Sequence, residues 1–512
     1  MKKFTLLLFA IAISTCMMAQ SVSLSKPYSN TWIRRPFVHS IPIGQDETNA
    51  YMYQYIRTTD PAQPKNYTEH FYIIDKSSLQ STDIPVTIPK THVMMGGFAN
   101  DNNIIAVYRH ASKKGDYINF TIANIDRNNN TITFNDASTI STATNKHYWP
   151  EYKTAKSPDG KMMAILTMVT GKNNQLENLF ATVVNNQGEF IWSGTVSPQF
   201  NGKTFAIGQL LVDNDGTIYL PAYTCQLRGE SVSNVEFMMN ICKEDGTVSV
   251  TESSNFGALQ NFTAKILSDG NIIVAGYYTD SYTNTATHSS GYYYYKFDPQ
   301  TESISDIHNY SFSNNYVEKN AWARFANVLG NQQYSITADN IYELENGNIV
   351  FCGEHRFTKA IYDNMTNSYS YQFLTKNILV ATFLDDGTSL FSMIEKQQLA
   401  GLAVNIYGSW SSLNISYSAF AYHNDMYFVF NDDNKNIPYP GKDAVCTVGG
   451  LTFPKNIETV LMRLTAEQEL TQKVLRDPNQ HFYAIEFTDD NTFYTTGVGK
   501  GDLFFNKYTV EE

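Results

Sequence analysis

The stretch ILSDGNIIVAGYYTD, Ile266–Asp280, decides the fold of this chain. Two apolar runs flank an Asp-Gly pair, and similar stretches return at LVDNDGTIYLPAYT, Leu211–Thr224, and at ELENGNIVFCGEH, Glu343–His355. Asp-Gly and Asn-Gly pairs suit type I′ hairpin turns, because both central residues of such a turn need positive φ angles. The recurrence therefore predicts a repeated unit of strand, tight turn and strand.

A second hairpin follows the first in each copy of the unit. Around Gly270 it reads SGYYYYKFDPQTE and SISDIHNYSFS, which completes four strands. The turn glycines Gly160, Gly216 and Gly270 are 56 and 54 residues apart, whereas Gly347 follows Gly270 by 77 residues, which indicates an insertion. Repeats of four short strands at this period are typical of a β-propeller.

Eight copies of the unit can be traced, and the last has only three strands before the chain ends at Glu512. The segment SVSLSKPYS, Ser21–Ser29, can supply the missing strand, which would join the ends of the ring and remove an exposed strand edge. We therefore predict an all-β protein, a β-propeller of eight four-stranded blades closed by the N-terminal strand, with seven blades as the alternative. Residues 20–512 form this single domain, with insertions near 313–337 and 397–417.

Residues 1–19 have the pattern of a secretory signal peptide. Lys2 and Lys3 precede an apolar run, Phe4–Ile13, which is shorter than the ~20 residues that span a bilayer. We expect cleavage after Ala19 and an exported protein that is periplasmic, outer-membrane-associated or secreted. The alternative is a lipoprotein anchored at Cys16, which the preceding threonine disfavours. No later segment is apolar enough for a transmembrane helix.

Composition excludes some functions. A net charge of −12 without clustered Lys and Arg argues against a nucleic-acid partner. Cys225, Cys242, Cys352 and Cys446 show neither CxxC pairing nor metal-ligand spacing, so we expect buried free thiols, no metal site and no cofactor. We expect a monomer, because nothing in the pattern indicates a second copy.

Two short motifs resemble those of known propellers. SPDGKMMAIL, Ser157–Leu166, resembles the blade motif of TolB-type propellers, and LSDGNIIVAG, Leu267–Gly276, is similar to short repeats of secreted bacterial propellers. As a whole the chain resembles the uncharacterised exported propellers of Gram-negative bacteria. This resemblance implies the fold and no particular activity.

The entry to the third blade, NKHYWPEYK, is the first candidate site. His147, Trp149 and Glu151 combine an acid-base group, a stacking face and a carboxylate within five residues. Such a set can hold a sugar, whose C–H face stacks on the indole while its hydroxyls bond to the carboxylate. The alternative is that Trp149 fills a gap between blades and His147 faces solvent.

Four further residues are candidate ligand-binding positions. Arg34 and Arg35, at the entry to the first blade, can bind a carboxylate or phosphate, or they can pair with the protein's own acids. Trp322 belongs to VEKNAWARFANVL, whose apolar spacing predicts a short helix with the indole as its anchor. Trp410 lies in a Gly- and Ser-rich insertion and is a candidate for exposed stacking.

Two other motifs have a structural interpretation. The run Tyr292–Tyr295 resembles a sugar platform, but alternate strand residues face opposite sides, so we expect these rings to pack between blades. Asp213 and Asp215 form part of a calcium loop that lacks the Glu at its twelfth position. A hairpin turn accounts for both aspartates.

No nucleophile elbow, HExxH motif or phosphate loop is present. Our interpretation is therefore an exported, non-catalytic propeller that binds a protein or a polysaccharide at the cell envelope. The alternative is a polysaccharide-acting hydrolase or lyase, whose residues would gather from distant blades onto the axial loop face. Whether the chain is an enzyme stays open, and the missing catalytic signatures favour a binding role.

Overall fold

The computed structural model describes most of the chain. The described residues are 19–25, 39–59, 66–100, 102–111, 117–127, 129, 131–141, 151–170, 176–198, 204–228, 231–254, 257–279, 289–312, 334–363, 368–396, 398–402, 416–437, 457–475, 481–499 and 502–510.

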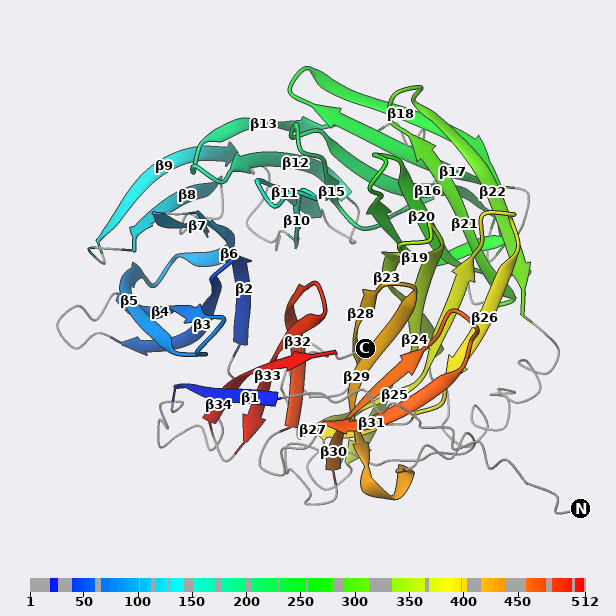
Figure 1. Ribbon diagram of the computed structural model, residues 1–512. Helices are drawn as coiled ribbons and strands as arrows, with labels where there is room; N and C mark the ends of the chain where they lie inside the picture. Colours follow the sequence, from blue (N-terminus) through cyan, green and yellow to red (C-terminus); the bar gives the residue numbers. More distant parts are fainter. Residues whose placement is uncertain are drawn as a thin grey trace, which may run out of the picture.

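Eight antiparallel sheets follow one another around a ring (Figure 1). This arrangement confirms the predicted eight-bladed β-propeller. The first four blades contain the following strands, in chain order: β2 (His39–Gln45), β3 (Asn49–Thr59), β4 (Asn66–Asp75) and β5 (Ser81–Pro89); β6 (Val93–Ala99), β7 (Asn103–Ala111), β8 (Tyr117–Asp126) and β9 (Ile132–Ser141); β10 (Glu151–Lys156), β11 (Met162–Thr170), β12 (Leu176–Asn185) and β13 (Phe190–Val196); β14 (Thr204–Ile207), β15 (Leu211–Val212), β16 (Ile218–Arg228), β17 (Ser231–Lys243) and β18 (Gly246–Ser253).

Blades five to seven continue the pattern, and a 3-10 helix, η2 (Asn434–Asn436), follows β29. Their strands are β19 (Ala258–Ile266), β20 (Ile272–Thr279), β21 (Gly291–Asp298) and β22 (Ser303–Ser311); β23 (Tyr334–Glu343), β24 (Ile349–Asp363), β25 (Ser368–Phe383), β26 (Ser389–Ile394) and β27 (Gln398–Leu402); β28 (Ser418–Tyr422), β29 (Asp425–Asp433), β30 (Ile457–Leu464) and β31 (Leu470–Leu475).

The eighth blade joins the two ends of the chain, as the sequence predicts. Its strands are β32 (His481–Asp489), β33 (Thr492–Gly499), β34 (Asp502–Thr509) and, on the outer edge, β1 (Ala19–Ser25). β1 pairs antiparallel with β34, with Ala19 opposite Tyr508 and Val22 opposite Phe505. Because β34 would otherwise present a row of unpaired backbone groups, this pairing covers the last blade's edge.

The turn after β19 differs in detail from the prediction. Only Gly270 has a positive φ, of 88°, and its N–H donates to the Leu267 carbonyl at 3.0 Å, while the Leu267 N–H donates to the Asn271 carbonyl at 2.8 Å. The loop therefore has three residues and closes with a left-handed glycine, rather than two residues with positive φ. Asp269 accepts the Asn271 N–H at 2.9 Å instead of adopting positive φ itself.

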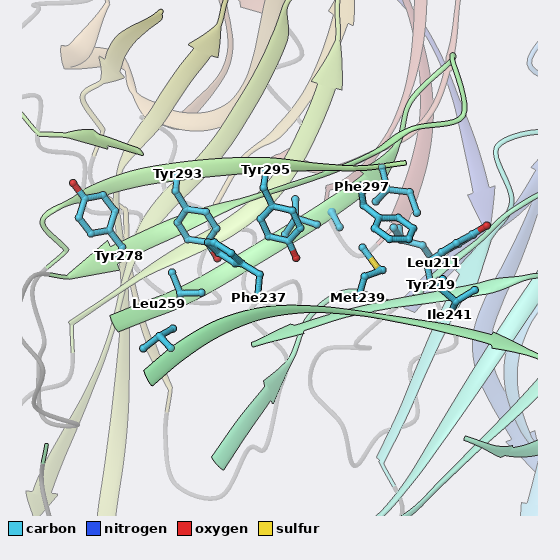
Figure 2. Packing of buried hydrophobic residues seen from close by; sticks show 14 of the residues in the cluster. Leu211, Tyr219, Phe237, Met239, Ile241, Leu259, Tyr278, Tyr293, Tyr295 and Phe297 are labelled. Atoms are coloured by element: carbon cyan, nitrogen blue, oxygen red, sulfur yellow. The ribbon is translucent and has the colours of Figure 1, made fainter. Parts of the chain in front are cut away.

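The cores lie between neighbouring blades. Alternate residues of β21 enter different cores: Tyr293 and Tyr295 pack toward blade four, and Tyr292 and Tyr294 pack toward blade six. Figure 2 shows Tyr293 and Tyr295 beside Phe237 of blade four, and the Phe237 and Tyr295 ring centroids are 4.6 Å apart. The prediction that the four tyrosines pack between blades is confirmed, because all are at most 5% exposed.

Antiparallel strand order gives the ring two different faces. Turns between first and second strands, and between third and fourth, lie on one side, which we call the turn face. The other side, the connection face, carries the links between second and third strands and those from blade to blade. On the turn face, Ser268 N–H donates to Glu343 at 2.8 Å and Asn346 N–H donates to Asn424 at 3.0 Å, so hydrogen bonds join successive blades.

The other structural expectations have mixed outcomes. Cys225, Cys242 and Cys352 are buried free thiols, as predicted, whereas Cys446 lies outside the described residues. Of the two predicted insertions, 313–333 and 403–415 are outside the described part, and the second begins with a strand, β27, that pairs with β25. Over the part of the chain that the structure describes, no helix has the length and apolarity to cross a membrane.

Deleting residues 20–25 should lower the unfolding temperature and promote association of the purified protein. The deletion removes β1 and exposes the outer edge of β34, which can then pair with another chain. Differential scanning calorimetry and sedimentation velocity would measure both effects. A truncated chain that stays monomeric with an unchanged unfolding temperature would contradict a closing role for β1.

Candidate functional site

The connection face is where side chains from several blades can meet one ligand. Loops there carry function while the packed blades maintain the scaffold. Among the residues predicted as a site, the structure describes Glu151 alone, as the exposed first residue of β10. Outside the described residues lie Arg34, Arg35, His147, Trp149, Trp322 and Trp410.

The densest group of charged side chains lies at the connection-face end of blade six, facing blade seven. Glu354 on β24 is fully buried, and so, almost completely, is Lys396, which follows β26. Lys396 Nζ donates to Glu354 Oε1 at 2.5 Å and to Thr375 Oγ1 at 3.0 Å. A buried carboxylate is tolerated here because a buried ammonium ion neutralises it.

Arg356 extends this group toward the inner strand. Its Nε donates to Glu354 Oε2 at 2.8 Å, and its Nη2 donates to Asp339 Oδ1 on β23 at 3.2 Å. Asp339 sits at a shift in the β23–β24 register, between Ala338 and Asn340. We call Asp339, Glu354, Arg356 and Lys396 the blade-six ion cluster; it contains two acids and two bases.

The ion cluster also holds the first residues of blade seven. Ser416 Oγ donates to Glu354 Oε2 at 2.7 Å, and the Ser416 N–H donates to Gln398 Oε1 at 2.6 Å. Gln398 Nε2 in turn donates to the Asn431 carbonyl at 2.7 Å. Ser416 has a φ of 91°, a conformation that costs about 1–3 kcal/mol outside glycine and that these bonds maintain.

Burial shapes the acidities in the cluster. It raises the pKa of Asp339 to about 6, although the Arg356 guanidinium opposes the rise. It lowers the pKa of Lys396, against the attraction of Glu354. Burial also acts to lower the pKa of Arg356, but the Asp339 and Glu354 carboxylates outweigh it and raise that pKa.

The two acids of the cluster differ in what they can do chemically. Both oxygens of Glu354 are engaged, by Lys396, Arg356 and Ser416, so this carboxylate has no free position for a substrate. Asp339 Oδ2, in contrast, is buried without a hydrogen-bond partner among the described residues. Asp339 is thus the acid of the cluster whose pKa is raised, although the Thr337 and Tyr417 hydroxyl groups act to lower it.

A second polar group lies at the connection-face end of the interface between blades two and three. Arg109, near the end of β7, places its guanidinium carbon 4.3 Å from the ring centroid of Tyr152 on β10. Burial raises the pKa of Tyr152, and the Arg109 charge opposes the rise. Tyr152 follows the predicted site residue Glu151 in the chain, but alternate residues of β10 face opposite sides, so Tyr152 and Arg109 lie at the interface with blade two and Glu151 lies on the side of blade four.

The sequence signal for these residues is the end of an apolar alternation. In β24 the positions facing blade seven read Val350, Cys352, Glu354 and Arg356, and in β7 those facing blade three read Ile105, Val107 and Arg109. A charged residue at the next position of such an apolar alternation is expected to be partly or fully buried. Asp339 and Lys396 carry no such signal, because only the folded ring brings them beside Glu354.

Potential metal ligands do not gather in the part of the chain that can be described. No three His, Cys, Asp or Glu side chains there lie close enough to hold an ion. Asp213 instead accepts the Asp215 and Thr217 N–H groups at 3.0 and 2.8 Å, as in the predicted hairpin turn.

The chain is similar to several solved structures at low sequence identity. No protein-family model matches the chain, and no curated protein matches it. Solved structures similar to it include a Bacteroides caccae protein of unknown function, 13% identical, over 70% of this chain and 93% of that one, with a TM-score of 0.27. The β-propeller domain of the Trilobed protease from Pyrococcus furiosus is 10% identical, over 87% and 98%, with a TM-score of 0.36. An α-L-arabinanase from Penicillium chrysogenum is 8% identical, over 66% and 94%, with a TM-score of 0.31. None of these similarities assigns a function.

Glu354→Gln should destabilise the protein by roughly 3–5 kcal/mol, because it leaves Lys396 as a buried charge without a counter-ion. Lys396→Met should do the same to Glu354. The double variant should be less destabilised than the sum of the two, since neither charge is then left alone. Chemical denaturation of the four proteins tests this cycle, and additive losses would show that the two groups do not interact.

Because of Asp339, the free energy of unfolding should fall as the pH rises. Its pKa is raised from 3.8 to about 6 in the folded state, so its contribution is full below pH 3.8 and is lost as the pH passes through 6. A shift of two units corresponds to about 3 kcal/mol. Denaturation of wild type and Asp339→Asn between pH 3.5 and 7 measures the difference, and parallel curves for the two proteins would contradict the prediction.

Proposed function

We propose that this protein is an exported, non-catalytic β-propeller that binds a polysaccharide or a protein at the cell envelope through its connection face. The export signal at residues 1–19 supports the location. The ring supports the binding role, because its connection face gathers side chains from neighbouring blades around one axis.

One observation carries the non-catalytic part of the proposal. In the blade-six ion cluster, Glu354 is used as an inter-blade contact, with both oxygens bound to Lys396, Arg356 and Ser416. A general acid or base must instead reach a proton of the substrate. Glu354 therefore serves as a contact between blades six and seven, and it is not available as a general acid or base.

One observation favours the alternative, a polysaccharide-acting hydrolase or lyase. Asp339 has a free buried oxygen and a pKa raised by burial to about 6, which are properties of a general acid. In this alternative, Asp339 would protonate a leaving group or take a proton near the axis. The partner acid or base for that step would come from another blade.

Residues 20–512 should show a higher unfolding temperature with a polysaccharide or an envelope protein fraction, without releasing products. A ligand at 100 times its dissociation constant stabilises by ~2.7 kcal/mol. Thermal unfolding with a glycan panel measures binding, and assays for reducing ends and unsaturated products measure turnover. Turnover that Asp339→Asn abolishes, while the unfolding temperature still rises with the glycan, would replace the binding proposal by the enzyme.

A further inference from the structure

We infer that Arg109 binds the carboxylate of a uronic acid residue in an otherwise hydroxyl-rich polysaccharide, at the connection-face end of the interface between blades two and three. This inference rests on the proposed binding function and names the ligand class and the residue that recognises it.

Arg109 occupies the position in blade two that Glu354 occupies in blade six. Beside the turn, the first residue that pairs with the preceding strand is Ile104 in β7 and Ile349 in β24. Arg109 and Glu354 each follow that residue by five positions. Each also continues the alternation that faces the following blade. The fold therefore places a charge at the same point of two interfaces.

The two interfaces differ in the partners that they provide for this charge. Glu354 has two cations and a hydroxyl group within 2.8 Å. Arg109 makes no ion pair with any residue that the structure describes, and its Nε is buried without an acceptor, although its side chain also interacts with the Tyr152 hydroxyl and acts to lower the pKa of that tyrosine. Because a guanidinium ion stays charged at all relevant pH values, blade two carries a cation without a counter-charge among these residues.

Tyr152 holds the guanidinium group in place. The guanidinium lies over the tyrosine ring, with 4.3 Å from its carbon to the ring centroid, and its Nε has no acceptor there. Arg109 as a whole is partly exposed, which leaves a route for a ligand. A planar donor fork held in this way suits a carboxylate, which it can bind through two parallel hydrogen bonds.

The charge of the whole protein favours a sugar over other carriers of a carboxylate. A net charge of −12 opposes a dense polyanion or a strongly acidic peptide. Isolated carboxylates on a chain rich in hydroxyl groups avoid this repulsion.

The test compares uronate-bearing polysaccharides with the same polymers after chemical reduction of their carboxyl groups. The probes are glucuronoxylan, hyaluronan and polygalacturonate, with polyglutamate as the acidic peptide, measured by calorimetry on residues 20–512. Wild type should bind at least one native uronate polymer and should lose that binding when the polymer is reduced. Arg109→Gln should weaken it about tenfold or more, and Arg109→Lys less, because the charge remains while the fork is lost.

Arg127→Gln is the matched control. Arg127, in the same blade, also lies over a tyrosine, 4.7 Å from the Tyr51 ring centroid, but on the turn face, where it donates to the Asn100 carbonyl at 2.7 Å. This variant should lower the unfolding temperature and keep the affinity, whereas Arg109→Gln should lower the affinity and keep the unfolding temperature.

The outcomes separate the inference from the proposed function. Equal binding of native and reduced polymers, or an unchanged affinity in Arg109→Gln, would overturn the inference and leave a carbohydrate-binding propeller. Tighter binding of polyglutamate than of any uronate polymer would overturn the sugar as ligand. Binding of an envelope protein alone would overturn the inference, and the absence of any glycan or protein ligand would overturn both.

Discussion

Each blade of this protein is packed against a neighbour on both of its faces, and the rest of the structure depends on that constraint. A central strand in such a sheet has no solvent-facing side, so both sets of its alternating residues must be apolar or neutralised. β20 shows the result, because all eight of its residues are buried. β21 divides its four consecutive tyrosines between two cores in the same way. Buried charges such as Glu354 and Lys396 are therefore found with neutralising partners.

The same constraint explains why charges at strand ends are informative. A charge at the end of an inward-facing alternation is partly removed from water, and the protein must supply partners for it or leave it to a ligand. At blade six the partners are complete for Glu354, and the network continues through Gln398 to Asn431 of blade seven. At blade two, Tyr152 lies against Arg109, and the Nε of Arg109 has no acceptor among the described residues. One fold position thus serves a structural role in one blade and offers a recognition group in another.

The two faces of the ring divide these roles. On the turn face, repeated Asp and Asn side chains cap their own loops and touch the next blade's turn, which fixes the spacing of the blades. On the connection face, the longer links leave room for side chains that differ from blade to blade. A protein built in this way can change its ligand without changing its scaffold, and this is why the fold alone does not assign an activity.

The sequence by itself determined the architecture of this protein. The glycine spacing, the four-strand unit, the incomplete last blade and the strand that completes it are all local patterns, and β1 on β34 follows from them. It also determined that the tyrosine run packs between blades. It misjudged the turn, because the choice between a two-residue and a three-residue loop depends on the register of the flanking strands.

Only the tertiary structure decided where the charges meet. Asp339 and Lys396 are 57 positions apart in the chain, and Arg109 and Tyr152 are 43 apart, so no periodicity along the chain relates them. The pairing of strands within blade six and the packing of blade two on blade three bring these strand ends together, and only the folded protein shows which partners each charge has.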